Sequence, residues 1–395
     1  MVANNPQKRS KPKTLKSEFG KVISFLHLWL GLAAGTILLV VALTGCILTF
    51  EDELTPIIYA QEQKVTPAPA RLSADSLVSL AKLTYPKKKI FRIYLPAEKD
   101  QSVKVTFGTK KKGYDYLYMN PYTGAILAKG KEAERFFPVV LNLHRYLLAG
   151  DTGKIITGIS CAITFFMTLS GLYLWWPNNK KVLKQRLKVK MDASRKRLNW
   201  DLHGVGGFYA MIFLFFITLT GLIWSYDWVE TMMFKMTDGK KEQVEVVKEP
   251  EGKIKKEKGI VELVVTATNT VYPTHGQIMI TFPDKKGKPF TVSKENSAAL
   301  VDTVSQLYLD SRTAKVLKVA SFSSLSLGSQ VRKLNKSIHT GSILGWPTKI
   351  IAFLTALITA SLPITGLLIW LGRGKKKKSK PKVNPLLSKP EPAVL

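Results

Sequence analysis

The chain contains only two cysteines and five histidines among its 395 residues. Cys46 and Cys161 both lie inside long apolar segments, which argues against a framework of disulfides. No Cys-x-x-Cys-His sequence occurs, so covalent attachment of a c-type haem is not expected. The chain also lacks a Gly-x-Gly-x-x-Gly fingerprint, which argues against a dinucleotide-binding domain.

Acidic residues are scarce as well. Only 28 Asp and Glu stand against 59 Lys and Arg, and the formal net charge is +31. The basic residues concentrate in 8–21, in 177–202 and after 372, next to apolar segments and with few aromatic residues between them. We therefore expect no nucleic-acid partner. Contact with anionic membrane lipid explains these runs better.

Four apolar segments are each long enough to span a bilayer, at about 23–50, 154–176, 204–226 and 347–371. Basic residues favour the cytoplasmic side of a membrane, so both termini and the short loop 177–202 are predicted to be cytoplasmic. The two longer connections then lie outside. We expect a multi-pass protein of the inner (cytoplasmic) membrane.

Each long connection predicts a small α+β unit, with one helix followed by short alternating strands. The predicted fold class is therefore an integral membrane α-helical protein, with four transmembrane helices as two tandem repeats and two extracytoplasmic α+β domains. The expected segments are a basic N-terminus 1–21, span 22–50, first outer domain 51–135, interfacial helix and span 136–176, basic loop 177–202, span 203–228, second outer domain 229–328, interfacial helix and span 329–372, and basic tail 373–395.

Four of the five histidines follow an internal repeat. Gly45 follows His27 by 18 residues, and Gly221 follows His203 by the same distance. Eighteen residues make five helical turns, so each histidine and glycine share one stripe, roughly 27 Å apart.

The second repeat begins at His144 and at His339. Lys154 and Lys349 each follow their histidine by 10 residues. A glycine follows each of the two histidines by 27 residues. The topology places His27 and His203 near the cytoplasmic surface and the other two histidines near the outer surface. If the halves are related by an axis along the membrane normal, equivalent histidines face each other.

Two neutral imidazoles that face each other suit the axial positions of a b-type haem. A tetrahedral zinc site would need more ligands in one place. The predicted cofactors are therefore two haem b, with the haem iron bound by His27 and His203 on one side and by His144 and His339 on the other.

A flat macrocycle between helices needs backbone that carries no side chain. Four glycines in register with the histidines are candidates to line it: Gly31, Gly207, Gly45 and Gly221. The alternative is that these small residues only let the helices pack closely. The candidate cations for haem propionates are Arg145, Lys154 and Lys349, although basic residues at span ends are common for other reasons.

The stretch His27-Leu28-Trp29-Leu30-Gly31 through Thr44-Gly45, with Phe50 to Leu54, resembles the PepSY-associated transmembrane helix family. The outer regions resemble PepSY domains at the turns Tyr118…Thr123-Gly124 and Tyr308…Thr313. The resemblance covers roughly 20–373, and members include bacterial inner-membrane di-haem siderophore reductases. It implies haem ligation by the four histidines and reduction of a ferric siderophore or ferric chelate in the periplasm, releasing Fe(II) for iron uptake.

We therefore expect an oxidoreductase that moves electrons across the membrane, with catalytic residues that the sequence does not identify. Because no dinucleotide fingerprint is present, the electron donor is expected to be a cytoplasmic protein or a membrane quinol. Two alternatives stay open at this point. One is a haem-free PepSY binding or regulatory protein, and the other is a di-haem cytochrome that passes electrons to a partner protein.

Overall fold

The computed structural model describes residues 15–177, 179–239, 247–252, 254–295 and 305–374. Most of the expected basic N-terminus 1–21 and nearly all of the tail 373–395 lie outside the described residues. The bounds of the helices and strands follow in chain order: α1 Leu15–Thr49, α2 Glu51–Ile58, α3 Ala60–Gln63, α4 Ala74–Thr84, β1 Ile90–Leu95, β2 Val103–Thr109, β3 Gly113–Met119, β4 Ile126–Lys131, η1 Glu132–Glu134, α5 Phe136–Tyr146, α6 Gly150–Trp175, α7 Lys180–Arg186, α8 Arg195–Ser225, α9 Asp227–Asp238, α10 Ile260–Val271, β5 Ile278–Thr281, β6 Phe290–Lys294, β7 Ser305–Leu309, β8 Val316–Ala320, η2 Phe322–Ser324, α11 Leu327–Thr340, η3 Ser342–Leu344, α12 Trp346–Leu371 and η4 Gly372–Gly374.

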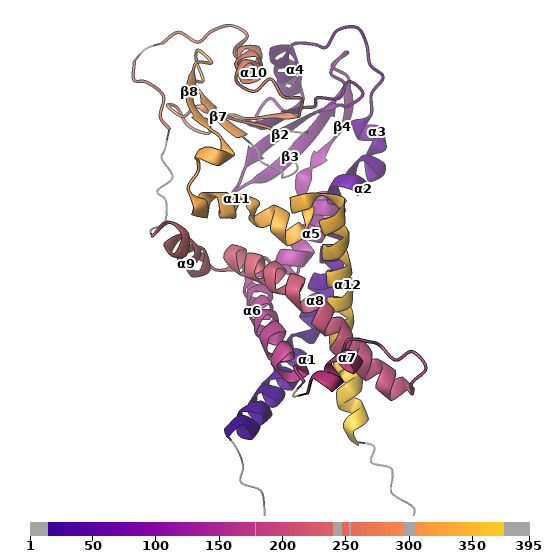
Figure 1. The fold of residues 1–395 in the computed structure, drawn as a ribbon. Coiled ribbons are helices and arrows are strands. Elements are labelled where there is room, and N and C mark those ends of the chain that lie inside the picture. The colour runs from indigo at the N-terminus through magenta and orange to yellow at the C-terminus, as the bar shows by residue number, and fades with distance from the viewer. Residues whose placement is uncertain (1–14, 178, 240–246, 253, 296–304, 375–395) are drawn as a thin grey trace, which may run out of the picture.

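Four helices, α1, α6, α8 and α12, are long and apolar enough to cross a membrane. Helix α1 packs against α6 and α12, and α8 packs against the same two helices, so α1 and α8 are diagonal neighbours in the bundle (Figure 1). Large apolar side chains such as Ile155, Phe216 and Leu368 point outward and contact lipid. The protein is therefore a multi-pass membrane protein.

Two short helices lie across one end of the bundle, between the spans and the sheet (Figure 1). Helix α5 packs on α1 and α6, and α11 packs on α8 and α9. The chain turns from α5 into α6 through Leu147 and Leu148, both with positive φ (49° and 57°). This tight turn folds α5 back against α6, the span that follows it, and against α1.

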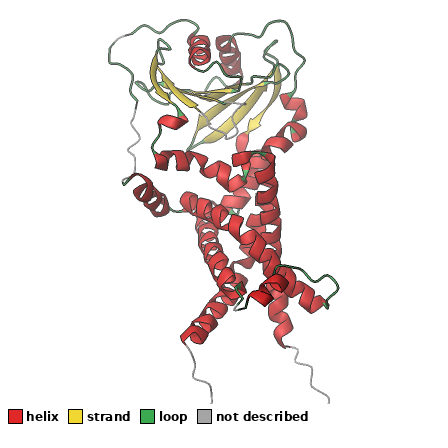
Figure 2. Ribbon diagram, viewed as in Figure 1, coloured by secondary structure: helices red, strands yellow, loops and turns green. Residues whose placement is uncertain are grey.

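Beyond these helices, all eight strands form one antiparallel sheet in the order β4-β3-β2-β1-β5-β6-β7-β8 (Figure 2). The sequence predicts two α+β domains, and the structure joins their strands into a continuous sheet through the pairing of β1 with β5. The observed class, membrane-spanning helices with α+β parts, confirms the predicted fold class.

Helices α4 and α10 cover the face of the sheet that points away from the bundle (Figure 1). Alternate residues of the strands, such as Ile93, Val105 and Leu307, are fully buried beneath them and form the apolar core. The two helices also cap each other. The Glu262 carboxylate accepts the N–H of Ala74 at 2.6 Å, and the Asp75 carboxylate accepts the N–H of Glu262 at 2.8 Å.

Candidate functional site

The four repeat histidines form two pairs, one at each end of the bundle. The sheet-side pair consists of His144 on α5 and His339 on α11, whose ring centroids lie 6.3 Å apart with an angle of 80° between the ring planes. Desolvation among the surrounding helices lowers the pKa of His144 to about 4 and that of His339 to about 3. Both imidazoles are therefore neutral at pH 7, which is the form that binds a metal.

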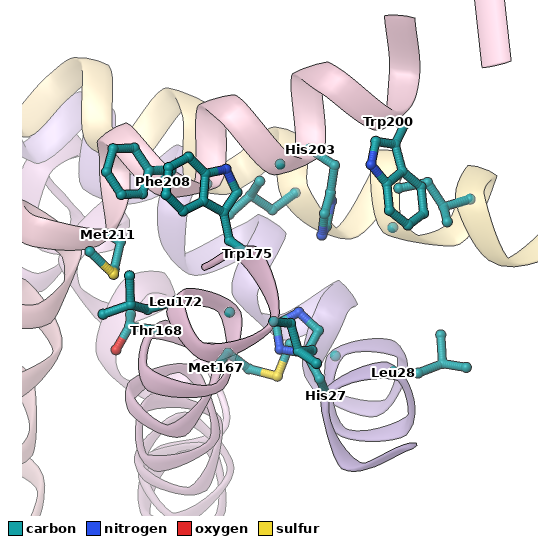
Figure 3. Close-up of a pocket in the computed structure, with 18 of the residues that line it drawn as sticks. His27, Leu28, Met167, Thr168, Leu172, Trp175, Trp200, His203, Phe208 and Met211 are labelled. Carbon is teal, nitrogen blue, oxygen red and sulfur yellow. The ribbon is translucent and has the colours of Figure 1, made fainter. Parts of the chain in front are cut away.

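The far pair consists of His27 on α1 and His203 on α8. Both side chains point from these diagonal helices into one cavity of about 570 Å³ (Figure 3). Its walls are largely apolar and aromatic, and include Trp175 stacked on Phe208 with ring centroids 3.8 Å apart. Apolar walls with a few convergent polar groups are typical of cofactor sites.

One contact recurs at all four histidines. Each Nδ1 lies within hydrogen-bond distance of a hydroxyl that directly precedes a glycine in the Thr-Gly and Ser-Gly pairs of a neighbouring span. The four distances are 2.8 Å from His27 to Ser170, 3.0 Å from His144 to Thr44, 2.9 Å from His203 to Thr365 and 2.9 Å from His339 to Thr220. Four histidines on four helices therefore share a single mode of anchoring.

The hydrogen-bond network fixes which ring nitrogen carries the proton. The Thr44 hydroxyl donates its one hydrogen to a carbonyl of its own helix, such as Val40 O at 2.7 Å, so its oxygen is left to accept. His144 Nδ1 also lies 2.9 Å from Val41 O, and a carbonyl can only accept. Nδ1 therefore donates, and the lone pair of Nε2 is available to a metal. A histidine that binds a metal through one ring nitrogen usually donates the N–H of the other ring nitrogen to a backbone carbonyl or a similar acceptor, as Nδ1 of His144 does here.

The glycines after these hydroxyls lie against the imidazoles. An added Cβ would come within 3.3–3.5 Å of a histidine Cε1 at every one of them: Gly45 against His144, Gly171 against His27, Gly221 against His339 and Gly366 against His203. The sequence assigns Gly45 and Gly221 to the space for a macrocycle, whereas the structure gives them the histidine ring itself as neighbour. An added Cβ would touch the ring at ordinary contact distance at Gly45, Gly171 and Gly221, and slightly closer, at 3.3 Å, at Gly366.

The other two candidate glycines, Gly31 and Gly207, line the cavity of the far pair. An added Cβ on Gly31 would lie 2.9 Å from Met167 Cε, and one on Gly207 would lie 3.7 Å from Leu362 Cδ2. Both positions keep the wall of this cavity open beside a histidine.

The three candidate cations have different surroundings. Arg145 lies beside the sheet-side pair, with its guanidinium 6.0 Å from the Trp224 ring, which in turn lies 5.1 Å from His339. Lys154 is exposed to solvent. Lys349 is buried and binds Glu53 at 2.8 Å and Asp52 at 3.3 Å, so two carboxylates compensate its charge. Arg145 is the cation best placed to meet an anionic group at this pair.

Three arginines line the cavity of the far pair, and the sequence offers one of them, Arg197, as a candidate cation because it lies six residues before His203. Arg186, Arg197 and Arg373 line the same cavity as His27 and His203, at the end of the bundle opposite the sheet. Arg197 forms an ion pair with Asp201 at 2.9 Å. Arg186 and Arg373 were not predicted, because in the sequence they are only members of basic runs in which many neighbouring cations look equivalent.

The donor set fits a planar iron cofactor better than a bare metal ion. Across the described ranges, no group of three or more His, Cys, Asp or Glu side chains is placed to hold a metal ion. The far pair has two imidazoles, a cavity with apolar walls and arginines at its edge, and the sheet-side pair has two neutral imidazoles and Arg145 beside them. These are the groups that a b-type haem requires.

The fold and the site together define a four-span membrane protein with a histidine pair at each end of its bundle and an α+β sheet outside it. The chain belongs to the PepSY-associated TM region family, whose model matches residues 25–373. A comparison with curated proteins finds no match.

Proposed function

We propose that this protein is a b-type di-haem electron-transfer protein of the bacterial inner membrane that reduces ferric siderophores or other ferric chelates in the periplasm. The observation that carries the proposal is the fourfold anchoring of histidine Nδ1 to a hydroxyl before glycine, in two pairs at opposite ends of the spans. A b-type haem held by two imidazoles supplies a reversible one-electron Fe(III)/Fe(II) couple.

The chain's own residues supply the rest. His27 and His203 would bind one haem, and His144 and His339 the other, each through Nε2. Arg145 would hold a propionate at the sheet-side pair. The basic loop around α7 lies at the end of the bundle opposite the sheet (Figure 1), which supports a cytoplasmic place for the far pair. The donor would then reach the far pair, and one electron would leave the sheet side for each ferric ion reduced.

The face of the sheet that points toward the bundle supports a chelate as the acceptor. Its strands carry a row of paired residues, Tyr94, Lys104 and Tyr118, with Lys104 Nζ 5.8 Å and 5.6 Å from the two ring centroids. Arg135 lies beside them, 5.1 Å from the Tyr118 ring. Lys104 is paired with Glu132 at 2.8 Å and Arg135 with Glu62 at 2.7 Å, so these cations are compensated. The tyrosine phenols are then the groups on this face that an oxygen-rich ferric chelate would meet.

Visible spectroscopy tests the haem part of the proposal. The protein purified from haem-supplied cells is expected to show a b-type spectrum when dithionite-reduced and oxidised samples are compared, with two haems per chain by quantitation. If the protein purified from haem-supplied cells contains no haem, the electron-transfer mechanism is refuted and the haem-free binding protein is favoured.

Stopped-flow mixing tests the acceptor. We expect a ferric siderophore to oxidise the reduced protein rapidly, while the gallium(III) complex of the same siderophore leaves it reduced because gallium(III) has no accessible lower state. Oxidation by the ferric complex no faster than in buffer would count against a reductase and favour transfer to a partner protein.

Replacing Thr220 with valine tests the anchoring of His339. Valine keeps the shape but removes one of the two acceptors at His339, and the backbone hydrogen bond to Ile217 remains. Loss of a partner of a metal-binding histidine typically costs about 10–100-fold in metal affinity. We expect haem to leave the variant faster by that order, measured by transfer to apomyoglobin, and Thr220→Ser to restore retention.

Thr218→Val is the matched control for Thr220→Val. Thr218 is also buried on α8, but its hydroxyl donates only to backbone carbonyls, such as Leu214 O at 2.8 Å. Equal haem retention in both valine variants would show that the hydroxyl of Thr220 does not support the ligand.

A further inference from the structure

The α+β sheet contains a buried lysine that the electron-transfer function does not use. Lys294, at the end of β6, is 6% exposed. Its Nζ donates to Asn269 Oδ1 and to Tyr272 O, both at 2.7 Å. No carboxylate in the described part of the chain lies within ion-pair distance of it. An ammonium group has three donors and one charge, so one donor and the whole charge lack a partner here.

The other half of the sheet shows that the fold does not need a lysine at this position. Val105 in β2 pairs with Ile93, and Val292 in β6 pairs with Ile280, so these positions correspond between the two halves. Two residues further along β2 and β6, Phe107 and Lys294 occupy corresponding positions, although the register of β1 shifts there and Phe107 pairs with Ile90. Phe107 is fully buried, with its ring centroid 5.0 Å from that of Tyr85. The first half therefore has an apolar ring at the position where the second half has an ammonium group.

Capping of α10 does not account for this difference. Lys294 binds the carbonyl of Tyr272, which is the C-cap of α10, and a cation is favourable at a helix C-terminus. The matching helix α4 ends at its own C-cap, Tyr85, with Phe107 packed there instead. The helix end is therefore compatible with an apolar residue, and burial of a charge costs more than this cap contributes.

Lys294 lines a pocket of about 800 Å³ between α4, α10 and the centre of the sheet. Most of the wall is apolar, with Leu77, Leu95, Val265 and Ile278 among its residues. Two other charged groups at the pocket are already engaged. Arg71 donates to the carbonyl of Pro96 at 2.8 Å, and Glu262 accepts the N–H of Ala74.

We propose that this pocket binds a carboxylate carried on an apolar body, with Lys294 as its counter-ion. Arg71 also bonds only to carbonyl oxygens, so Arg71 and Lys294 contribute two positive charges to the pocket and Glu262 contributes one negative charge. The net charge of these three groups, +1, matches a monocarboxylate better than a phosphate, which carries close to two negative charges at pH 7. The apolar wall takes the body of the ligand, and the third N–H of Lys294 takes its carboxylate. The site is separate from both histidine pairs, so it stands whether or not the chain binds haem.

Two sources share this chemistry, an acyl chain acid and the C-terminus of an apolar peptide. The probes are octanoate and N-acetyl-Ala-Val-Leu with a free carboxylate, titrated by calorimetry into the full chain in nanodiscs. Their uncharged counterparts, methyl octanoate and the peptide amide, report binding that does not depend on charge. We expect at least one acid to bind tenfold or more tightly than its uncharged form.

Lys294→Met removes the charge at similar length, and Lys294→Phe installs the residue of the other half. Both are expected to weaken binding of the acid at least tenfold while the temperature of unfolding stays within a few degrees. Lys129→Met, on the exposed edge strand β4, is the matched control and should bind as the unmodified chain does.

The stronger acid identifies the source. Tighter binding of octanoate indicates an acyl acid, and tighter binding of the peptide indicates a protein C-terminus. Equal binding of each acid and its uncharged form, or binding that both Lys294 variants leave unchanged, would overturn the assignment.

Discussion

Replacing His339 with alanine is expected to halve the haem bound per chain. His339 supplies one imidazole of the sheet-side pair, with its centroid 6.3 Å from that of His144. The two rings lie close enough that both could hold one haem, which would supply the redox chemistry at this pair. Removal of one ring leaves a single ligand and a gap, while the far pair keeps both imidazoles.

The measurement is haem quantitation together with the reduced-minus-oxidised spectrum of the purified variant. His203→Ala should remove the other half of the haem, so the two variants together resolve the spectrum of each site. His275→Ala is the matched control, because this fifth histidine is 63% exposed and lies on the loop before β5, far along the chain from any span. Full haem in His339→Ala, or equal loss in His275→Ala, would refute the assignment of ligands.

The sequence predicted the histidine pairs because their spacing is a local property of helices. A fixed offset from His27 to Gly45 keeps both residues on one stripe wherever the helix lies. The start of a helix is also a local property of the sequence: Ser73 precedes a segment with helical spacing of apolar residues, and in the structure it is the N-cap of α4 and accepts the N–H of Ser76 at 3.2 Å.

The sequence could not predict which side chains the glycines contact, because these contacts depend on how the helices pack against one another. Gly45 meets His144 only because α5 folds back onto α1 after a turn at Leu147 and Leu148. The spacing alone is equally consistent with an open wall for a cofactor. The signal that could have indicated the real contact is the hydroxyl that precedes the glycine in all four copies.

Lys349 shows where a repeat misleads. Lys154 and Lys349 share one offset from their histidines, so the sequence treats them alike. Asp52 and Glu53 follow His27 by 25 and 26 residues, and the matching positions after His203 are Trp228 and Val229. The first half therefore carries acids that bind the lysine of the second half, whereas the second half carries none at the matching positions, and Lys154 is exposed.

The sequence also could not predict that the strands of the two outer domains join into one sheet. The pairing of Tyr94 with Met279 links strands far apart in the chain, and nothing in either strand marks its edge as the one that will be covered. Alternation predicts a strand and its buried face, but it does not predict which strand lies alongside.

Replacing Gly153 with alanine is expected to disrupt the sheet-side pair through the backbone alone. Gly153 lies in the first turn of α6, where an added Cβ would come 1.6 Å from the carbonyl oxygen of Tyr146. That oxygen belongs to the last residue of α5, two residues after His144. No side-chain rotation relieves a contact between a Cβ and a backbone oxygen, so α5 and α6 must move apart.

Overpacking of this kind costs about 1–3 kcal/mol, and more where the backbone cannot yield. We expect a lower unfolding temperature and loss of haem from the sheet-side site, while the far pair keeps its spectrum. Gly20→Ala is the matched control, because a Cβ there would meet only Tyr173 Oη at 3.7 Å. A Gly153→Ala variant with full haem would show that the position of α5 is not set by its close approach to α6, and that His144 reaches its partner by another constraint.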